Sequence, residues 1–218
     1  MPDWRELATR GQSRYRDGGE RLPDDDPDAR QRQLTRMGNA AAGAGLALLM
    51  AGEPGAAEEW FGRAHDVYRA SWDDAPPGSW GRAIAMLKAR ILVGDWSGAD
   101  EDARWTLEQG AAEAETPIGR YAGCLALLTL SRWEEARVLA DGLRTRDDFP
   151  GAVGDAMAMI AAEDRVGYIE AVEAVLESFE AREEYLEDVP VADTVLVLQA
   201  LAGRRELATE LTSSLLPA

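Results

Sequence analysis

The sequence predicts an all-α fold in which helical hairpins stack as a short right-handed α-solenoid. Of the 218 residues 38 are alanine, β-branched residues are sparse, and apolar residues recur three and four positions apart, as they do on the buried face of a helix. Similar segments also recur along the chain at intervals of 35 to 42 residues. A hairpin of this length cannot bury its apolar stripe alone, so neighbouring hairpins are expected to stack.

The first predicted helix carries one stripe of apolar and small residues and ends at Gly18-Gly19. The stripe consists of Trp4, Leu7, Gly11 and Tyr15. A polar, acidic loop from Glu20 to Asp28 follows the helix. We therefore divide the chain into an N-terminal helix with its loop, residues 1–28, and a helical-repeat array, residues 29–218, within a single compact domain.

Capping residues followed by proline predict where the later helices begin. Asp26-Pro27 starts a long helix, because a proline in the first turn has no N–H to leave unpaired. This helix is expected to run to Ala51 and to stop at Gly52, and Pro54 opens the next one. Further starts are expected at Ser79-Trp80, Thr116-Pro117, Phe149-Pro150 and Val189-Pro190.

Two stretches repeat one pattern most clearly. Each begins with a Gly-Arg pair and continues through a short turn, a tryptophan and two alanines. The first contains Gly81-Arg82, Gly94-Asp95-Trp96, Ala99 and Ala103, and the second contains Gly119-Arg120, Ser131-Arg132-Trp133, Ala136 and Ala140. The shift is 38 residues at the Gly-Arg pair and 37 at the tryptophan. Each stretch is predicted to form two antiparallel helices joined by a turn.

The first hairpin resembles the tetratricopeptide repeat. Small residues stand where two helices would cross, with an aromatic residue between them, at the spacing of Gly45, Leu48, Ala57, Phe61 and Ala64. The resemblance covers residues 40–180, although Ala41 stands where the family prefers tryptophan and the repeat length varies. The resemblance implies a protein that binds other proteins on a concave face.

The last 30 residues resemble the C-terminus of the immunity-49 family of polymorphic-toxin immunity proteins. The similar stretch runs from Asp188 to Pro217 and consists mostly of apolar helix residues. The family usually places a glycine after an arginine pair, whereas Gly203 precedes Arg204-Arg205 here. This resemblance implies that the protein neutralises a toxin.

Charge and composition exclude several classes of function. A net charge of −17 and a pI near 4.4 argue against binding to nucleic acids or anionic membranes, because both require a concentrated positive field. One cysteine excludes a disulfide within the chain, and one histidine with one cysteine excludes the common zinc sites. The N-terminus lacks a signal-peptide pattern, and the longest apolar stretch, Ala40 to Ala51, is too short to span a membrane, so a cytoplasmic protein is expected.

Arginine supplies almost all of the positive charge, since Lys88 is the only lysine. Lysine depletion with an excess of acidic residues resembles the proteins of halophilic archaea, in which molar salt screens the self-repulsion of an acidic chain. A GC-rich genome, which favours codons for arginine, alanine and glycine, would also deplete lysine. Both explanations are compatible with the sequence.

No residue pattern predicts catalysis, a metal ion or a cofactor. His65 lies in a helical stripe, and Cys124 lies among small residues, where a free cysteine behaves as a buried apolar residue. The acidic runs Asp24–Asp26 and Glu183–Asp188 lack the alternating ligands and glycine turn of a calcium loop. Glycine-rich phosphate-binding loops are missing as well. We therefore expect no catalytic residues, no metal ligands and no cofactor.

The segment from Ser71 to Arg82 is the strongest candidate for a binding surface. Two Ser-Trp pairs flank a Pro-Pro-Gly turn in it. Tryptophan and arginine are common at binding hot spots, and a loop restricted by proline loses little entropy on binding. We predict a contact surface made of Trp72, Trp80, Arg82 and Arg120. In the alternative, the tryptophans fill the groove between two hairpins as part of the core.

The function expected from these observations is a non-enzymatic module that binds a protein or peptide along the groove of the repeats. Three alternatives stand beside it: a protein that neutralises a toxin by occluding it, a small-molecule enzyme with clustered carboxylates, and a structural subunit that buries its tryptophan-bearing face in a symmetric homodimer. A single tight partner, a closed pocket of perturbed carboxyl groups and self-association would distinguish them.

Overall fold

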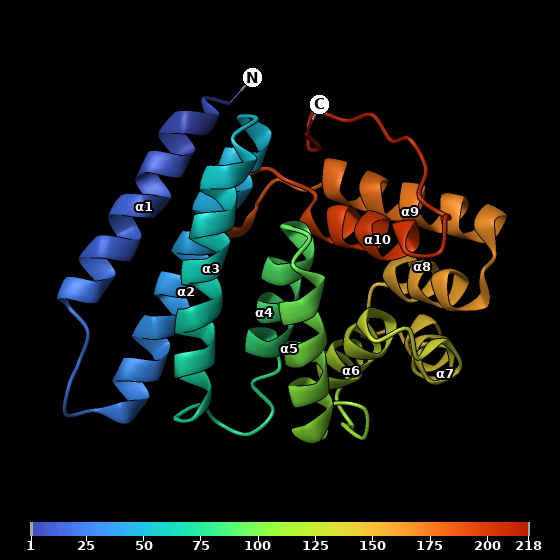
Figure 1. Ribbon diagram of the computed structural model, residues 1–218, viewed down its shortest axis with the longest axis horizontal. Coiled ribbons are helices and arrows are strands. Elements are labelled where there is room, and N and C mark those ends of the chain that lie inside the picture. Colours follow the sequence, from blue (N-terminus) through green and yellow to red (C-terminus); the bar gives the residue numbers. More distant parts are fainter. Residues whose placement is uncertain (1, 218) are drawn as a thin grey trace. The chain divides into compact units, whose positions relative to one another are not determined.

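A computed structural model describes residues 2–217, and this part of the chain is all-helical (Figure 1). Ten α-helices and one short 3-10 helix, and no strand, occur within it. In chain order the helices are α1 (Trp4–Glu20), α2 (Pro27–Met50), α3 (Pro54–Trp72), α4 (Gly81–Leu92), α5 (Trp96–Glu108), α6 (Pro117–Thr129), α7 (Trp133–Arg144), α8 (Gly151–Ala162), α9 (Arg165–Glu180), η1 (Leu186–Asp188) and α10 (Asp193–Gly203). The all-α prediction is confirmed.

The chain forms two compact units. The first contains the described residues up to Val93, the segment Arg182–Val191 and the described residues from Thr212 on. The second contains Gly94–Ala181 and Ala192–Leu211. Helices α1 to α4 and η1 therefore belong to the first unit, and α5 to α10 belong to the second.

In the first unit each helix packs against the next one along the chain, and α1, α2 and α3 lie side by side (Figure 1). Glycines on α2 allow α3 to approach closely. A Cβ atom at Gly45 would lie 3.0 Å from the ring of Phe61, and one at Gly38 would lie 2.6 Å from the ring of Tyr68. Small residues therefore stand where these two helices cross, as the sequence led us to expect.

Most predicted helix starts agree with the structure. The Asp26 carboxylate accepts a hydrogen bond from the Ala29 N–H at 2.9 Å, and Pro27 is the first residue of α2. Thr116 caps α6 in the same way, with its hydroxyl oxygen 3.2 Å from the Gly119 nitrogen. The first N–H groups of a helix have no partner within the helix, so residues whose side chains accept hydrogen bonds from them are common at helix starts.

Two predicted helix ends are wrong. Helix α1 continues through Gly18 to Glu20, because Gly18 is buried against α2, where a Cβ atom would lie 2.6 Å from Cγ of Met37. Helix α10 begins at Asp193 and not at Val189-Pro190. Val189 and Val191 are 4% and 3% exposed, so burial of an extended segment takes precedence over the proline signal there.

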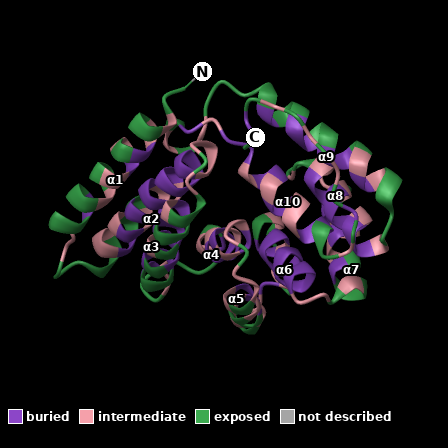
Figure 2. Cartoon of the chain, turned by 45° about the horizontal axis from the view of Figure 1, so that its top comes forward, coloured by how far each residue is buried: buried purple, intermediate pink, exposed green. Residues whose placement is uncertain are grey.

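The second unit contains the whole second repeat and the part of the first repeat from Gly94 on, whereas Gly81-Arg82 lies on α4 in the first unit. Helices α5 to α9 pack in chain order, and α10 lies against α8 and α9. Trp96 and Trp133 are the first residues of α5 and α7, and Ala99 and Ala136, three positions later in each helix, have no exposed surface. Figure 2 shows that buried residues cover nearly the whole of α6. The tryptophan-to-alanine parts of the two repeats therefore match in structure, although α6 and α7 pack against each other while α4 and α5 belong to different units.

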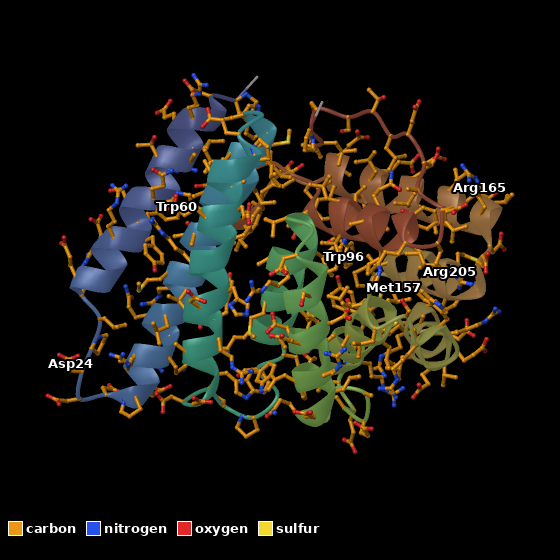
Figure 3. The ribbon with its side chains drawn as sticks, viewed as in Figure 1. Asp24, Trp60, Trp96, Met157, Arg165 and Arg205 are labelled. Atoms are coloured by element: carbon orange, nitrogen blue, oxygen red, sulfur yellow. The ribbon has the colours of Figure 1, made fainter. Side chains whose placement is uncertain are left out.

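Two arginines, Arg204 and Arg205, directly follow the end of α10 at Gly203, and Figure 3 labels Arg205. The Arg204 guanidinium lies 4.7 Å from the ring centroid of Trp96, and that of Arg205 lies 4.7 Å from the ring centroid of Trp133. Arg205 Nη1 also donates hydrogen bonds to the carbonyl oxygens of Ile160 (3.0 Å) and Ala161 (2.7 Å), near the end of α8. Cations are favourable at this end of a helix, where carbonyl groups lack partners.

Candidate functional site

Trp72 and Trp80 lie at the two ends of the connection between α3 and α4, in the first unit. Their ring centroids are 5.5 Å apart, and the ring planes meet at 52°. Trp80 is only 8% exposed, whereas Trp72 is half-buried. The pair therefore has one covered member and one member that reaches solvent.

The same connection forms a hollow of about 290 Å³ beside Trp72. We call it the Trp72 hollow, and its lining is Trp72, Asp73, Ala75, Pro76, Pro77 and Gly78. Proline fixes φ at two of these positions, and Gly78 has φ +80°, which favours glycine. The Ser79 hydroxyl donates to the Pro76 carbonyl oxygen at 2.6 Å. The wall of the hollow thus has few accessible backbone conformations.

Arg82 supports this connection from within the unit. Its Nε donates to the Ser71 hydroxyl oxygen at 2.8 Å, and its Nη2 donates to Oε1 of Gln31. Ser71 has no exposed surface and Gln31 is 3% exposed, so both polar side chains depend on partners inside the protein. Burial lowers the pKa of Arg82, but a guanidinium keeps its proton in any protein. Arg82 therefore joins α4 to α2 and α3.

Arg120 is the arginine of the other Gly-Arg pair and lies in the second unit. It lies in the first turn of α6, is half-buried, and its Nε donates to the Ala114 carbonyl oxygen at 3.1 Å. A Cβ atom at Gly142 would lie 3.6 Å from Nη1 of Arg120, so α7 packs close to this side chain. Arg120 therefore lies against the connection that precedes its own helix, whereas Arg82 bonds to side chains of α2 and α3.

The structure brings Trp72, Trp80 and Arg82 together and places Arg120 in the other compact unit. Of the four, Trp72 borders the Trp72 hollow. Sequence reasoning missed Gln31, which lies 51 positions from Arg82. The available signal was a polar residue on the buried face of the predicted helix, three positions before Leu34 and seven before Gly38.

The isolated titratable residues lie in the positions expected for structural roles. His65 is 9% exposed, with Nδ1 3.2 Å from Oδ1 of Asp66. Cys124 is fully buried, its Sγ donates to the Ala136 carbonyl oxygen at 3.3 Å, and burial raises the pKa of its thiol.

Between residues 2 and 217, no group of three or more His, Cys, Asp or Glu side chains lies close enough together to hold a metal ion. Asp24 lies in the exposed loop between α1 and α2 (Figure 3).

Among the helices of the described chain, none is both long enough and apolar enough to cross a membrane. In the comparisons with known proteins, no family model, no curated protein and no solved structure matches this chain.

Proposed function

We propose that this protein is a non-enzymatic interaction module that binds a protein or peptide partner at the Trp72 hollow. The proposal includes a right-handed, tetratricopeptide-like arrangement of the hairpins and a cytoplasmic location. Its main support is the hollow itself, in which a half-buried tryptophan borders a space of about 290 Å³ beside two prolines. A partner side chain that entered it would bury apolar area on both the indole and the proline rings.

The construction behind the hollow favours binding. Trp80 lies against Trp72, and Arg82 ties Ser71, which precedes Trp72 in the chain, to α2 and α4. A surface that is already held in one conformation loses little entropy when a partner binds. In this proposal Trp72 is the contact residue, Trp80 and Arg82 position it, and Arg120 has the equivalent positioning role in its own unit.

Replacing Trp72 tests the proposal. Tagged wild-type protein and Trp72→Ala would be used for affinity capture in the source organism at its native salt concentration, with bound proteins quantified by mass spectrometry. We expect capture to fall about tenfold or more, as at a binding hot spot. The free energy of unfolding should change by only about 1 kcal/mol, because Trp72 is half-buried. Trp80→Ala, by contrast, should cost about 3 kcal/mol or more as a core truncation.

Trp105→Ala is the matched control, because Trp105 is a half-buried tryptophan in the second unit. Equal losses of capture in both variants would contradict a site at the hollow. A single stoichiometric partner whose toxicity is blocked would make the module a toxin-neutralising protein. Absence of any partner above background would reject the interaction module in favour of a small-molecule enzyme or a self-associating subunit.

A further inference from the structure

Arginines are concentrated at the start of this acidic chain. Residues 1–36 contain eight arginines and eight acidic residues, so they carry no net charge, and the remaining residues carry the whole −17. Seven of these eight arginines lie on α1 or α2, which pack against each other in the first unit. An anionic group meets less repulsion at this neutral part of the chain than elsewhere on the negative molecule.

Three of these arginines line a cavity of about 360 Å³ in the first unit, which we call the arginine cavity. Its charged lining is Arg14, Asp17, Arg21, Arg36 and Glu187, and the amide of Gln33 borders it too. Met37 and Ala40, which are 6% and 2% exposed, supply an apolar surface. The cavity thus offers cationic donors beside a hydrocarbon wall.

A carboxylate of this chain already lies in the cavity. Glu187 Oε2 is 2.7 Å from Nη1 of Arg14, and its carbonyl oxygen accepts a hydrogen bond from Arg10 at 2.8 Å. The Glu187 side chain is 19% exposed. Glu187 and Asp188 both have positive φ, 56° and 58°, a conformation that residues with side chains rarely adopt. The chain therefore takes an unusual turn that delivers a carboxylate to Arg14.

The other two arginines retain donors for a second carboxylate. Arg36 is exposed, and among the described residues its side chain gives one hydrogen bond, from Nη1 to Oε1 of Gln33 at 3.3 Å. Arg21 is exposed as well and contacts only its helical neighbour Asp17 within the described chain, with Nε donating to the carbonyl oxygen at 3.0 Å. A guanidinium has five N–H donors, so both can bind a carboxylate in the geometry that it prefers.

The charge of the lining indicates which anion fits. Three arginines against Asp17 and Glu187 give the cavity a net charge of +1. One carboxylate neutralises this charge, whereas a phosphate dianion would leave an excess negative charge near two carboxylates. The apolar wall at Met37 favours a carboxylate that carries methylene groups, as in glutamate.

We propose that the arginine cavity binds a glutamate side chain of a peptide or protein partner, with its carboxylate on Arg21 and Arg36 and its methylene groups on Met37. This site is independent of the Trp72 hollow, because the two cavities share no residue. Loss of binding at one of these sites would therefore leave binding at the other unchanged.

The site can be tested by titrating the protein with a short blocked peptide, acetyl-Gly-Glu-Gly-amide. Binding is monitored by NMR through the signals of the arginine Nε–Hε groups. We expect the signals of Arg21 and Arg36 to shift and to give a millimolar dissociation constant, as one exposed charged contact would. Arg36→Ala and Arg21→Ala should each weaken binding by about fivefold. Glu187→Gln should tighten it by about threefold, because it frees Arg14.

The controls separate this site from general charge attraction. Arg16→Ala removes the same charge from the exposed side of α1 outside the cavity and should leave binding unchanged. Glu184→Gln is the corresponding control for Glu187, in the same connecting segment. Equal binding of the Gly-Gln-Gly peptide, an equal loss in Arg16→Ala, or no shift at all would overturn the proposal. Equally tight binding of free formate, which lacks the methylene groups, would overturn their contact with Met37.

Discussion

Cys124 and Tyr168 are buried ionisable residues of the second unit, and both stay protonated in the folded chain. Burial raises the pKa of both groups above their ordinary values of 9.0 and 10.0. The unfolded chain releases these protons at the ordinary values while the folded chain keeps them. Stability from these groups is therefore fully present below about pH 9 and falls as the pH rises, by up to about 1.4 kcal/mol per pH unit for each group.

Urea denaturation at increasing pH would measure this dependence. Cys124→Ala and Tyr168→Phe should each flatten the alkaline slope, because each removes one proton that only the unfolded chain releases. Tyr168→Phe should also cost about 1 kcal/mol at neutral pH, since the Tyr168 hydroxyl donates to Oε1 of Gln199 at 2.7 Å. An alkaline slope that both variants share with the wild-type protein would show that neither proton contributes.

Single residues also show how far sequence reasoning extends. The burial of Cys124 could be predicted from its small apolar neighbours and is confirmed. The sequence pointed to the tryptophans beside the Pro-Pro turn, but it could not distinguish exposed contact residues from residues that fill the core. The burial of each indole decides this, and it depends on tertiary contacts such as that of Arg82 with Gln31, which lies 51 positions away. Local patterns carry no information about which distant polar side chains meet.

At the scale of an element, α10 is anchored by Arg205, two residues after the helix ends at Gly203. Arg205 has a side-chain exposure of 15%, lies over the Trp133 ring and donates to two carbonyl oxygens of α8. Arg205→Ala should lower the free energy of unfolding by about 2 to 3 kcal/mol, because it leaves those carbonyl groups unpaired and uncovers the indole. Hydrogen exchange should accelerate most in α10 and at the end of α8.

Arg146→Ala is the control for this change. Arg146 pairs with Asp148 at 2.6 Å on the exposed surface of the same unit, so its loss should change stability by less than about 1 kcal/mol. Uniform acceleration of exchange across the unit in Arg205→Ala would contradict a local anchoring role and indicate global destabilisation instead.

The elements themselves were mostly predictable, for a physical reason. Caps such as Asp26 and Thr116 act within one turn of chain, so the sequence alone reveals them. The end of α1 and the start of α10 depend on burial against other segments, at Gly18 and at Val191, and a local signal cannot report that. Elements are misjudged where tertiary contacts override the local preference.

At the scale of the whole molecule, the two units differ strongly in charge. The first contains 14 basic and 18 acidic residues, a net charge of −4, and the second contains nine basic and 22 acidic residues, a net charge of −13. The repeat pattern predicted stacked hairpins, but it gave no indication of this division. Self-repulsion should therefore destabilise the second unit far more than the first at low ionic strength.

Salt dependence tests both this imbalance and the resemblance to halophilic proteins. The Debye length falls from about 10 Å at 0.1 M salt to about 3 Å at 1 M, so repulsion among the 22 acidic residues of the second unit would be screened. We expect helicity to rise steeply with KCl. Amide protection measured by hydrogen exchange should increase more in α6 to α8 than in α2 and α3.

Choline chloride at equal ionic strength should have the same effect if screening is the cause, whereas an uncharged osmolyte should stabilise both units alike. Full helicity and equal protection of the two units in dilute buffer would contradict the halophilic interpretation. The abundance of arginine would then reflect codon usage in a GC-rich genome, because composition alone requires no salt dependence of folding.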